Sequence, residues 1–194
     1  MTMYHEGNRE LQDAFGSRAL ADRLADKLAH DRFTEADATF IAAQSFFFLA
    51  TSDAAGRPDC SFKGGPPGFV RVMAPDLLVF PDYDGNGMFK SLANIVANSH
   101  VGLLFIVMGE KPARLRVNGR AEVVRDDPMM AQIPGAQLLV RVTPTAIFPN
   151  CPRYIPDLAT GQPSVYAPQP NVEPVEPAWK SFGVFADVVP PRRR

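Results

Sequence analysis

Hydrophobic residues follow a helical spacing over the first part of the chain. Leucine and phenylalanine recur at mostly helical intervals between residues 9 and 30, with charged residues between them, so an amphipathic helix weakened by Gly16 is expected there. Thr34 is followed three residues later by Asp37, a loose capping box that predicts a second, short helix. Residues 1–44 are therefore expected to form an N-terminal helical segment that packs on the domain after it.

The pattern changes at Phe46 to short apolar runs separated by turn-forming residues. These runs are bounded by glycine, proline or aspartate, which is typical of strands joined by tight turns. The expected strands cover residues 46–51, 59–63, 69–73, 77–80, 100–107, 113–125 and 138–148. One helical pattern, at residues 89–97, interrupts them. Six or so closely spaced strands with a single interrupting helix favour a Greek-key β-barrel over alternating βαβ units.

Beyond residue 148 the chain is rich in proline and has little periodicity. Residues 149–194 are therefore expected to form an irregular arm that lies over the surface or over a partner subunit. A length of 194 residues suits one core, here residues 45–148, with peripheral helices.

Charge and composition exclude some classes of function. The formal net charge is -1, which provides no long-range attraction to nucleic acid or to an anionic membrane. The N-terminal residues are polar and lack the apolar segment of a secretory signal, so a cytoplasmic location is expected. Two cysteines and three scattered histidines predict neither a disulfide nor a metal site.

A candidate anion-binding element lies between residues 77 and 95. A predicted strand leads into a loop with two glycines and Asn86, and the following helix has Lys90 and Ser91 in or near its first turn. Unpaired amides and the positive end of the helix dipole attract an anion there, and a lysine and a hydroxyl add directed donors. The pattern points to a phosphate, while Lys90 taken alone is also compatible with an ordinary surface lysine.

Two other phosphate-binding motifs are excluded in this stretch. A Walker-type loop requires glycine directly before the lysine, where this chain has Phe89. A dinucleotide fingerprint requires a third glycine three residues after the second, and Lys90 occupies that position.

Several short motifs follow one another in a particular order between Phe46 and Val124. They are Gly56-Arg57-Pro58, the strand at 59–64, Leu77 to Pro81, Lys90-Ser91, Asn94-Ile95, Asn98, the apolar run at 101–105, and Arg114 to Ala121. In this order and spacing they resemble the FMN-binding split-barrel family of pyridoxamine 5'-phosphate oxidase. The resemblance implies a mainly β fold with peripheral helices, a six-stranded antiparallel Greek-key split β-barrel that binds FMN.

The resemblance also assigns roles to particular residues. In this family the strand after the first hairpin contacts the flavin, the end of the next strand flanks its ring or ribityl chain, and the helix start holds its phosphate. The implied FMN-binding residues are Ser61, Phe62, Lys63, Gly64, Phe80, Pro81, Asn86, Lys90, Ser91, Arg114 and Arg116. Similar proteins place the site between two subunits, which implies a homodimer.

This chain departs from the oxidase itself at functional positions. Ser61 stands where the oxidase usually has an arginine, so the charge that binds the phosphate is expected from Lys63, Lys90 or Arg114. The oxidase's later substrate-phosphate segment is not found, so pyridoxamine phosphate is not the expected substrate. We therefore expect an FMN-dependent oxidoreductase acting on a small molecule. The alternative is a non-catalytic protein that binds flavin, another phosphate ligand or haem, for example as a sensor.

Two further segments leave their roles open. The Gly-Gly-Pro-Pro-Gly sequence at 64–68 fits either close approach of a ligand to the backbone or a plain loop between strands. Cys151 is followed by Arg153 and Tyr154, and a structural or substrate-lining role is expected because a reactive thiol needs a base or a positive field beside it.

Overall fold

The computed structural model describes residues 3–162, 164–167 and 175–190, so parts of the predicted Pro-rich arm lie outside the described residues. The chain forms two compact units. The larger unit contains residues 30–107 and 113–150, and the smaller contains the described residues among 1–29, 108–112 and 151–194. Nearly all of the predicted FMN-binding barrel therefore belongs to the larger unit.

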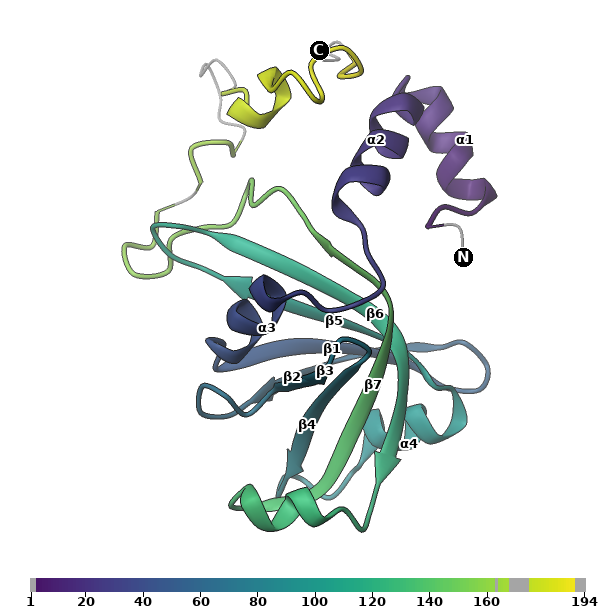
Figure 1. The fold of residues 1–194 in the computed structure, drawn as a ribbon, viewed down its shortest axis with the longest axis vertical. Coiled ribbons are helices and arrows are strands. Elements are labelled where there is room, and N and C mark those ends of the chain that lie inside the picture. Colours follow the sequence, from purple (N-terminus) through teal and green to yellow (C-terminus); the bar gives the residue numbers. More distant parts are fainter. Residues whose placement is uncertain (1–2, 163, 168–174, 191–194) are drawn as a thin grey trace. The chain divides into compact units, whose positions relative to one another are not determined.

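An antiparallel sheet of seven strands forms the larger unit (Figure 1). Its strands are β1 (Phe46–Ser52), β2 (Pro58–Gly64), β3 (Arg71–Ala74), β4 (Leu77–Tyr83), β5 (His100–Val107), β6 (Ala113–Val124) and β7 (Ala136–Pro149). They are hydrogen-bonded in the order β2-β1-β5-β6-β7-β4-β3. The predicted mainly β split-barrel class is confirmed. The seven strands correspond to the seven ranges expected from the sequence pattern, one more than the six-stranded barrel that the resemblance implies; the short β3 pairs with β4.

Three short helical elements accompany the sheet. Helix α3 (Glu35–Ala42) precedes β1, helix α4 (Lys90–Ala97) connects β4 to β5, and the 3-10 helix η1 (Pro128–Gln132) connects β6 to β7. Helix α4 packs on β1, β2 and β6, whereas α3 packs on β3. The helix that positions the predicted phosphate site is thus held by both the edge strand β2 and its neighbour.

The core of the larger unit contains three phenylalanine rings from different strands. Phe47, Phe80 and Phe105 are completely buried. The ring centroid of Phe47 lies 5.0 Å from that of Phe80 and 5.2 Å from that of Phe105. Burial of each such side chain contributes about 1.5–3 kcal/mol, so this cluster fixes β1, β4 and β5 relative to one another.

A bulge bends the two longest strands. The register of β6 against β7 shifts between Asn118 and Gly119. A side chain at Gly119 would collide with the backbone carbonyl of Thr143 on β7, so this position requires glycine. Bulges increase local twist and curvature, so β6 and β7 bend at this point.

Asp37 anchors the start of α3. Its amide donates to the Thr34 hydroxyl, and its carboxylate accepts from the Thr34 backbone N–H, so the predicted capping box is confirmed. The same carboxylate lies 2.8 Å from the Nε2 atom of His30. Burial raises the pKa of Asp37, but the hydrogen bonds from Thr34 and His30 outweigh it and leave this pKa below its ordinary value.

The smaller unit contains the N-terminal helices and the described parts of the C-terminal arm. The predicted single helix is wrong: α1 (Glu6–Ala14) and α2 (Arg18–Leu28) are separate, because Gly16 adopts a left-handed conformation with φ 64°. The 3-10 helix η2 (Ala178–Ser181) lies in the arm, and Arg23 of α2 forms an ion pair with Asp187. That the helical segment packs on the barrel stays a prediction. None of the helices in the described part of the chain has the length and apolar character needed to cross a bilayer.

Candidate functional site

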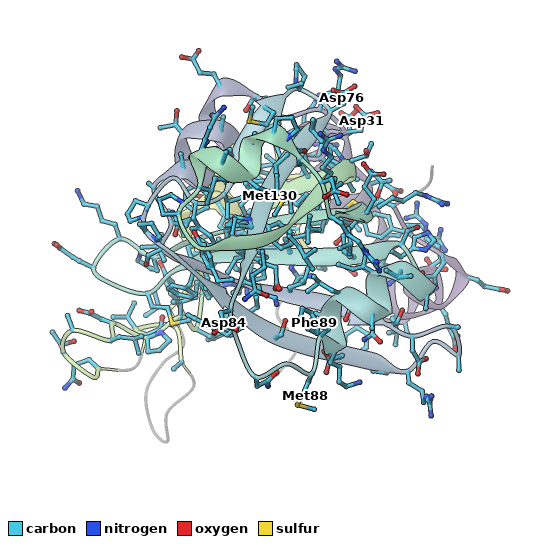
Figure 2. All side chains as sticks on the ribbon, turned by 90° about the horizontal axis from the view of Figure 1, so that it is seen from below. Asp31, Asp76, Asp84, Met88, Phe89 and Met130 are labelled. Atoms are coloured by element: carbon cyan, nitrogen blue, oxygen red, sulfur yellow. The ribbon has the colours of Figure 1, made fainter. Side chains whose placement is uncertain are left out.

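A pocket of about 550 Å³ opens where β2, the end of β4 and the start of α4 meet. This volume is within the usual range for small-molecule sites. Its lining residues are Asp59, Cys60, Ser61, Phe62, Lys63, Asp82, Tyr83, Asp84, Gly85, Asn86, Gly87, Met88, Phe89, Lys90, Ser91, Leu92 and Gln137. All of them belong to the larger unit. Figure 2 labels three of these residues, Asp84, Met88 and Phe89, which belong to the end of the pocket lining between β4 and α4.

The start of α4 has no side chain that caps it. Its N-cap residue, Phe89, has a left-handed backbone with φ 47° and makes no side-chain capping hydrogen bond. Asn86, earlier in the loop, accepts instead from the amide of Met88 at 3.0 Å. The amides of the first helical turn are therefore left without a side-chain acceptor at the positive end of the helix dipole. This is the arrangement that an anionic group fills in many proteins.

Two hydroxyl groups lie beside this helix start. The Oγ atoms of Ser61 on β2 and Ser91 on α4 are 2.9 Å apart, and either can be the donor. Ser91 is only 5% exposed, so the pair lies at the base of the pocket. A hydroxyl both donates and accepts, and the pair can therefore turn one hydrogen toward a bound anion while the other keeps the two elements joined.

Buried polar contacts hold α4 in register with the sheet. The side-chain amide of Asn94 donates to the Thr51 hydroxyl on β1 at 3.0 Å, and both residues are buried. The side-chain amide of Asn98 donates to the Ser52 hydroxyl at 2.8 Å. Because unsatisfied buried groups are costly, these bonds prevent the helix from sliding. The amides of its first turn are thus preorganised.

An ion pair lies further along the same pocket. The Nζ atom of Lys63 on β2 is 3.4 Å from Oδ1 of Asp82 on β4, and the two side chains are only 20% and 11% exposed. Lys90, which also lines the pocket, is by contrast exposed. The pocket lining therefore includes one largely buried lysine in an ion pair and one exposed lysine.

The structure brings together six of the predicted site residues. Those that line the pocket are Ser61, Phe62, Lys63, Asn86, Lys90 and Ser91. Gly64, at the end of β2, is outside the lining, as is the loop after it. The lining residues are grouped because β2 contacts the start of α4. The strand–loop–helix pattern indicated the residues of the loop and helix, and the family resemblance indicated those of β2.

The remaining predicted site residues lie elsewhere in the larger unit. Phe80 is part of the core and has no exposed surface, and Pro81 beside it is also buried, so neither lines this pocket. At the end of β4 the lining side chain is Asp82 instead. Arg114 and Arg116 stand on β6, opposite Ile106 and Leu104 of β5. Their part in binding stays a prediction.

Asp82 and Gln137 also line the pocket but were not predicted from the sequence. Asp82 could have been noticed as a carboxylate at the end of an otherwise apolar strand, where a buried charge needs a partner. Gln137 gave no signal, because it enters the pocket through an irregularity in the pairing of β4 and β7. In the described part of the chain, no group of three or more potential metal ligands is assembled.

The fold and pocket together define a split β-barrel with an anion-accepting helix start beside an edge strand. A family model for pyridoxamine 5'-phosphate oxidase matches residues 33–151, which is more than half of the chain. The chain therefore belongs to the pyridoxamine 5'-phosphate oxidase family, a family of flavin-binding proteins. No curated protein matches it.

Solved structures with a similar fold have low sequence identity. An FMN-binding protein from Syntrophomonas wolfei is 11% identical, with 75% of this chain and 96% of that chain covered and a TM-score of 0.48. The haem storage protein HutZ from Vibrio cholerae is 19% identical over 60% of this chain and 94% of that one, with a TM-score of 0.43. HupZ from group A Streptococcus is 17% identical over 68% and 98%, with a TM-score of 0.49. At these values the likeness says nothing of what this chain binds.

Proposed function

We propose that this protein is an FMN-dependent oxidoreductase that acts on a small molecule. One observation carries the proposal: the uncapped start of α4 faces a pocket that also holds the Ser61–Ser91 hydroxyl pair and Lys90. Amides at a helix start, hydroxyls and an ammonium group are the donors that a phosphate monoester requires. Membership of a flavin-binding family makes FMN the expected bearer of that phosphate.

The residues present fit this cofactor. The phosphate would accept from the first amides of α4, from the hydroxyl pair and from Lys90, while Lys63 and Phe62 would meet the more distant part of the molecule. FMN, when bound, supplies the hydride and electron transfer. The chain's own residues bind the phosphate, orient the ring and exclude water, and no dedicated acid or base is required.

We also propose that the protein is a homodimer with its sites beside the subunit interface. Phe46, Phe48 and Phe62 form an aromatic cluster on β1 and β2, in which the rings of Phe46 and Phe62 stack 5.4 Å apart. Phe62 is 62% exposed and also lines the pocket, so an apolar surface runs directly into the site. Covering such a surface with a second copy is favourable. Arg114 and Arg116 would then lie close to the covered face.

We also expect the protein to work in the cytoplasm.

Absorption spectroscopy tests the proposal. The purified full chain is incubated with FMN or with riboflavin, which lacks the phosphate, and the bound flavin is measured after gel filtration. We expect FMN to bind at least tenfold more tightly, because charge-assisted hydrogen bonds to a phosphate are worth about 1.5–3 kcal/mol. Equal affinity for the two would contradict the phosphate assignment. Failure to bind either one would end the proposal.

Reduction separates catalysis from mere binding. Flavin bound to the protein is mixed with NADH or NADPH without oxygen, and its visible absorbance is followed. Bleaching faster than that of free FMN supports the oxidoreductase. Bound flavin that does not react with a panel of reductants supports the sensor alternative instead.

A further inference from the structure

A bulge at the end of β4 brings three residues with polar side chains into the pocket. Asp82 pairs with Leu138 of β7 and Tyr83 pairs with Ala136, which leaves Gln137 between them as an extra residue. Bulges of this kind re-aim side chains beside functional sites. Here Asp82, Tyr83 and Gln137 all line the pocket.

Asp82 is the pocket residue that restrains Lys63. The two side chains come from β2, at one end of the sheet order, and from β4, next to its other end, and they meet at 3.4 Å within the pocket. An ammonium group has three N–H donors, so Lys63 can keep this contact and donate to a ligand at the same time. The contact thus restricts where the Lys63 cation can be, and it also places a negative charge next to it.

The spacing along β2 locates this pair relative to the phosphate. Ser61 and Lys63 are two residues apart on one strand and both line the pocket, so they lie about 6.6 Å apart along the strand. If FMN binds with its phosphate at Ser61 and Ser91, Lys63 and Asp82 would be the charged pair in the same pocket available to the rest of the molecule. A charge near the ring is one of the means by which a protein tunes a flavin.

We infer that Asp82 is a positioning residue that holds Lys63 beside the flavin ring and offsets its charge, so that the flavin is kept at a low reduction potential. The inference rests on the proposed FMN site. Reduced FMN carries more negative charge than oxidised FMN, and an uncompensated lysine beside the ring would favour the reduced form. The Asp82 carboxylate removes that preference while leaving Lys63 as a donor.

The test is the midpoint potential of FMN bound to the full-length protein. Asp82→Asn keeps the shape of the side chain and removes its charge. We expect it to increase the affinity for reduced FMN relative to oxidised FMN about tenfold, which is a positive shift of about 30 mV for a two-electron couple. The control is Asp84→Asn, which removes the charge of an exposed carboxylate in the same pocket lining and is expected to shift the ratio less than threefold.

A double variant shows whether Asp82 acts through Lys63. In a Lys63→Met background, Asp82→Asn should shift the potential less than it does in the wild type, because only the direct effect of the carboxylate charge remains and no lysine is released from its contact. An equal shift in both backgrounds overturns the positioning role, as does an Asp82→Asn shift no larger than that of Asp84→Asn. Where Asp82→Asn does not fold, Lys63→Met alone is measured: we expect a lower potential, and an unchanged one overturns the inference. If the wild type binds no FMN, the proposed function fails as well. If the wild type binds FMN but these substitutions do not change its midpoint potential, only this inference fails.

Discussion

The hydroxyl oxygens of Ser61 and Ser91 lie 2.9 Å apart although the two residues are 30 positions apart in the chain. One belongs to an edge strand and the other to the first turn of a helix, so the contact defines the corner where an anion would be bound. Removing either hydroxyl leaves the other without its partner. The pair therefore contributes to folding and, on our proposal, to binding.

Ser91→Ala should weaken both properties by modest amounts. Loss of one hydrogen bond to a largely buried group costs about 1 kcal/mol of stability, and loss of one phosphate donor should lower FMN affinity about fivefold to tenfold. Urea denaturation and fluorescence titration measure the two effects. Comparison with Ser61→Ala and with the double variant gives the coupling free energy between the two hydroxyls. Strictly additive effects of the two substitutions would contradict a shared role.

Lys90→Ala should weaken FMN binding far more than folding. Lys90 is exposed at the helix start, so it contributes little to the core, whereas a charge-assisted bond to phosphate is worth about 1.5–3 kcal/mol, or roughly tenfold to hundredfold in affinity. Titration with FMN and thermal denaturation separate the two. Lys111→Ala, at another exposed lysine, is the matched control. If Lys90→Ala binds normally and Lys63→Ala does not, the anchor is Lys63.

Acid should destabilise the protein partly through Asp37. The pKa of Asp37 is lowered in the folded state from an ordinary value of 3.8, so its contribution to stability is complete above that value and is lost as the pH falls through the lower, folded-state pKa. Thermal denaturation between pH 6 and pH 2.5 should show a shallower acid-side decrease for Asp37→Asn than for wild type. The decrease should persist in part, because the pKa of Asp53 and that of Asp127 are also lowered. Parallel curves for the two proteins would rule out the Asp37 contribution.

Phe62→Glu should convert the proposed dimer into monomers. The substitution places a charge within the aromatic cluster of β1 and β2, which a subunit interface would have to bury unpaired. Sedimentation equilibrium measures the mass directly. Met73→Glu, on β3 and similarly exposed at 50%, is the control and should leave the mass unchanged. A monomeric wild-type protein, or a dimer that survives Phe62→Glu, would contradict the assignment of this face.

The strands were largely predictable because turn-forming residues separate them. Prolines, glycines and aspartates mark nearly every strand boundary, and the strand–loop–helix element that ends in Lys90 and Ser91 was identified from local pattern alone. The break between α1 and α2 was underestimated, since a single glycine in a helical pattern is often tolerated. In this chain Gly16 takes a left-handed conformation and separates the helices.

The local pattern indicated Lys90 and Ser91 at the helix start, and the family resemblance indicated Ser61 and Lys63 on the strand after the first hairpin. Alternate residues of one strand share a face, so Ser61 and Lys63 lie together in the pocket. Phe80 obeys the same alternation, which directs it into the core beside Phe47, and a fold-family resemblance does not reveal that. Asp82 and Gln137 depend on a bulge between strands more than 50 residues apart in the chain, and such pairing has no local signature.

The N-terminus of α4 is uncapped at the left-handed residue Phe89, and a bound phosphate would serve as its cap. The ligand would then be an integral part of the secondary structure. Saturation at one hundred times the dissociation constant would add about 2.7 kcal/mol to the stability of the protein. The amides of Lys90 and Ser91 would change from freely exchanging to protected against hydrogen exchange.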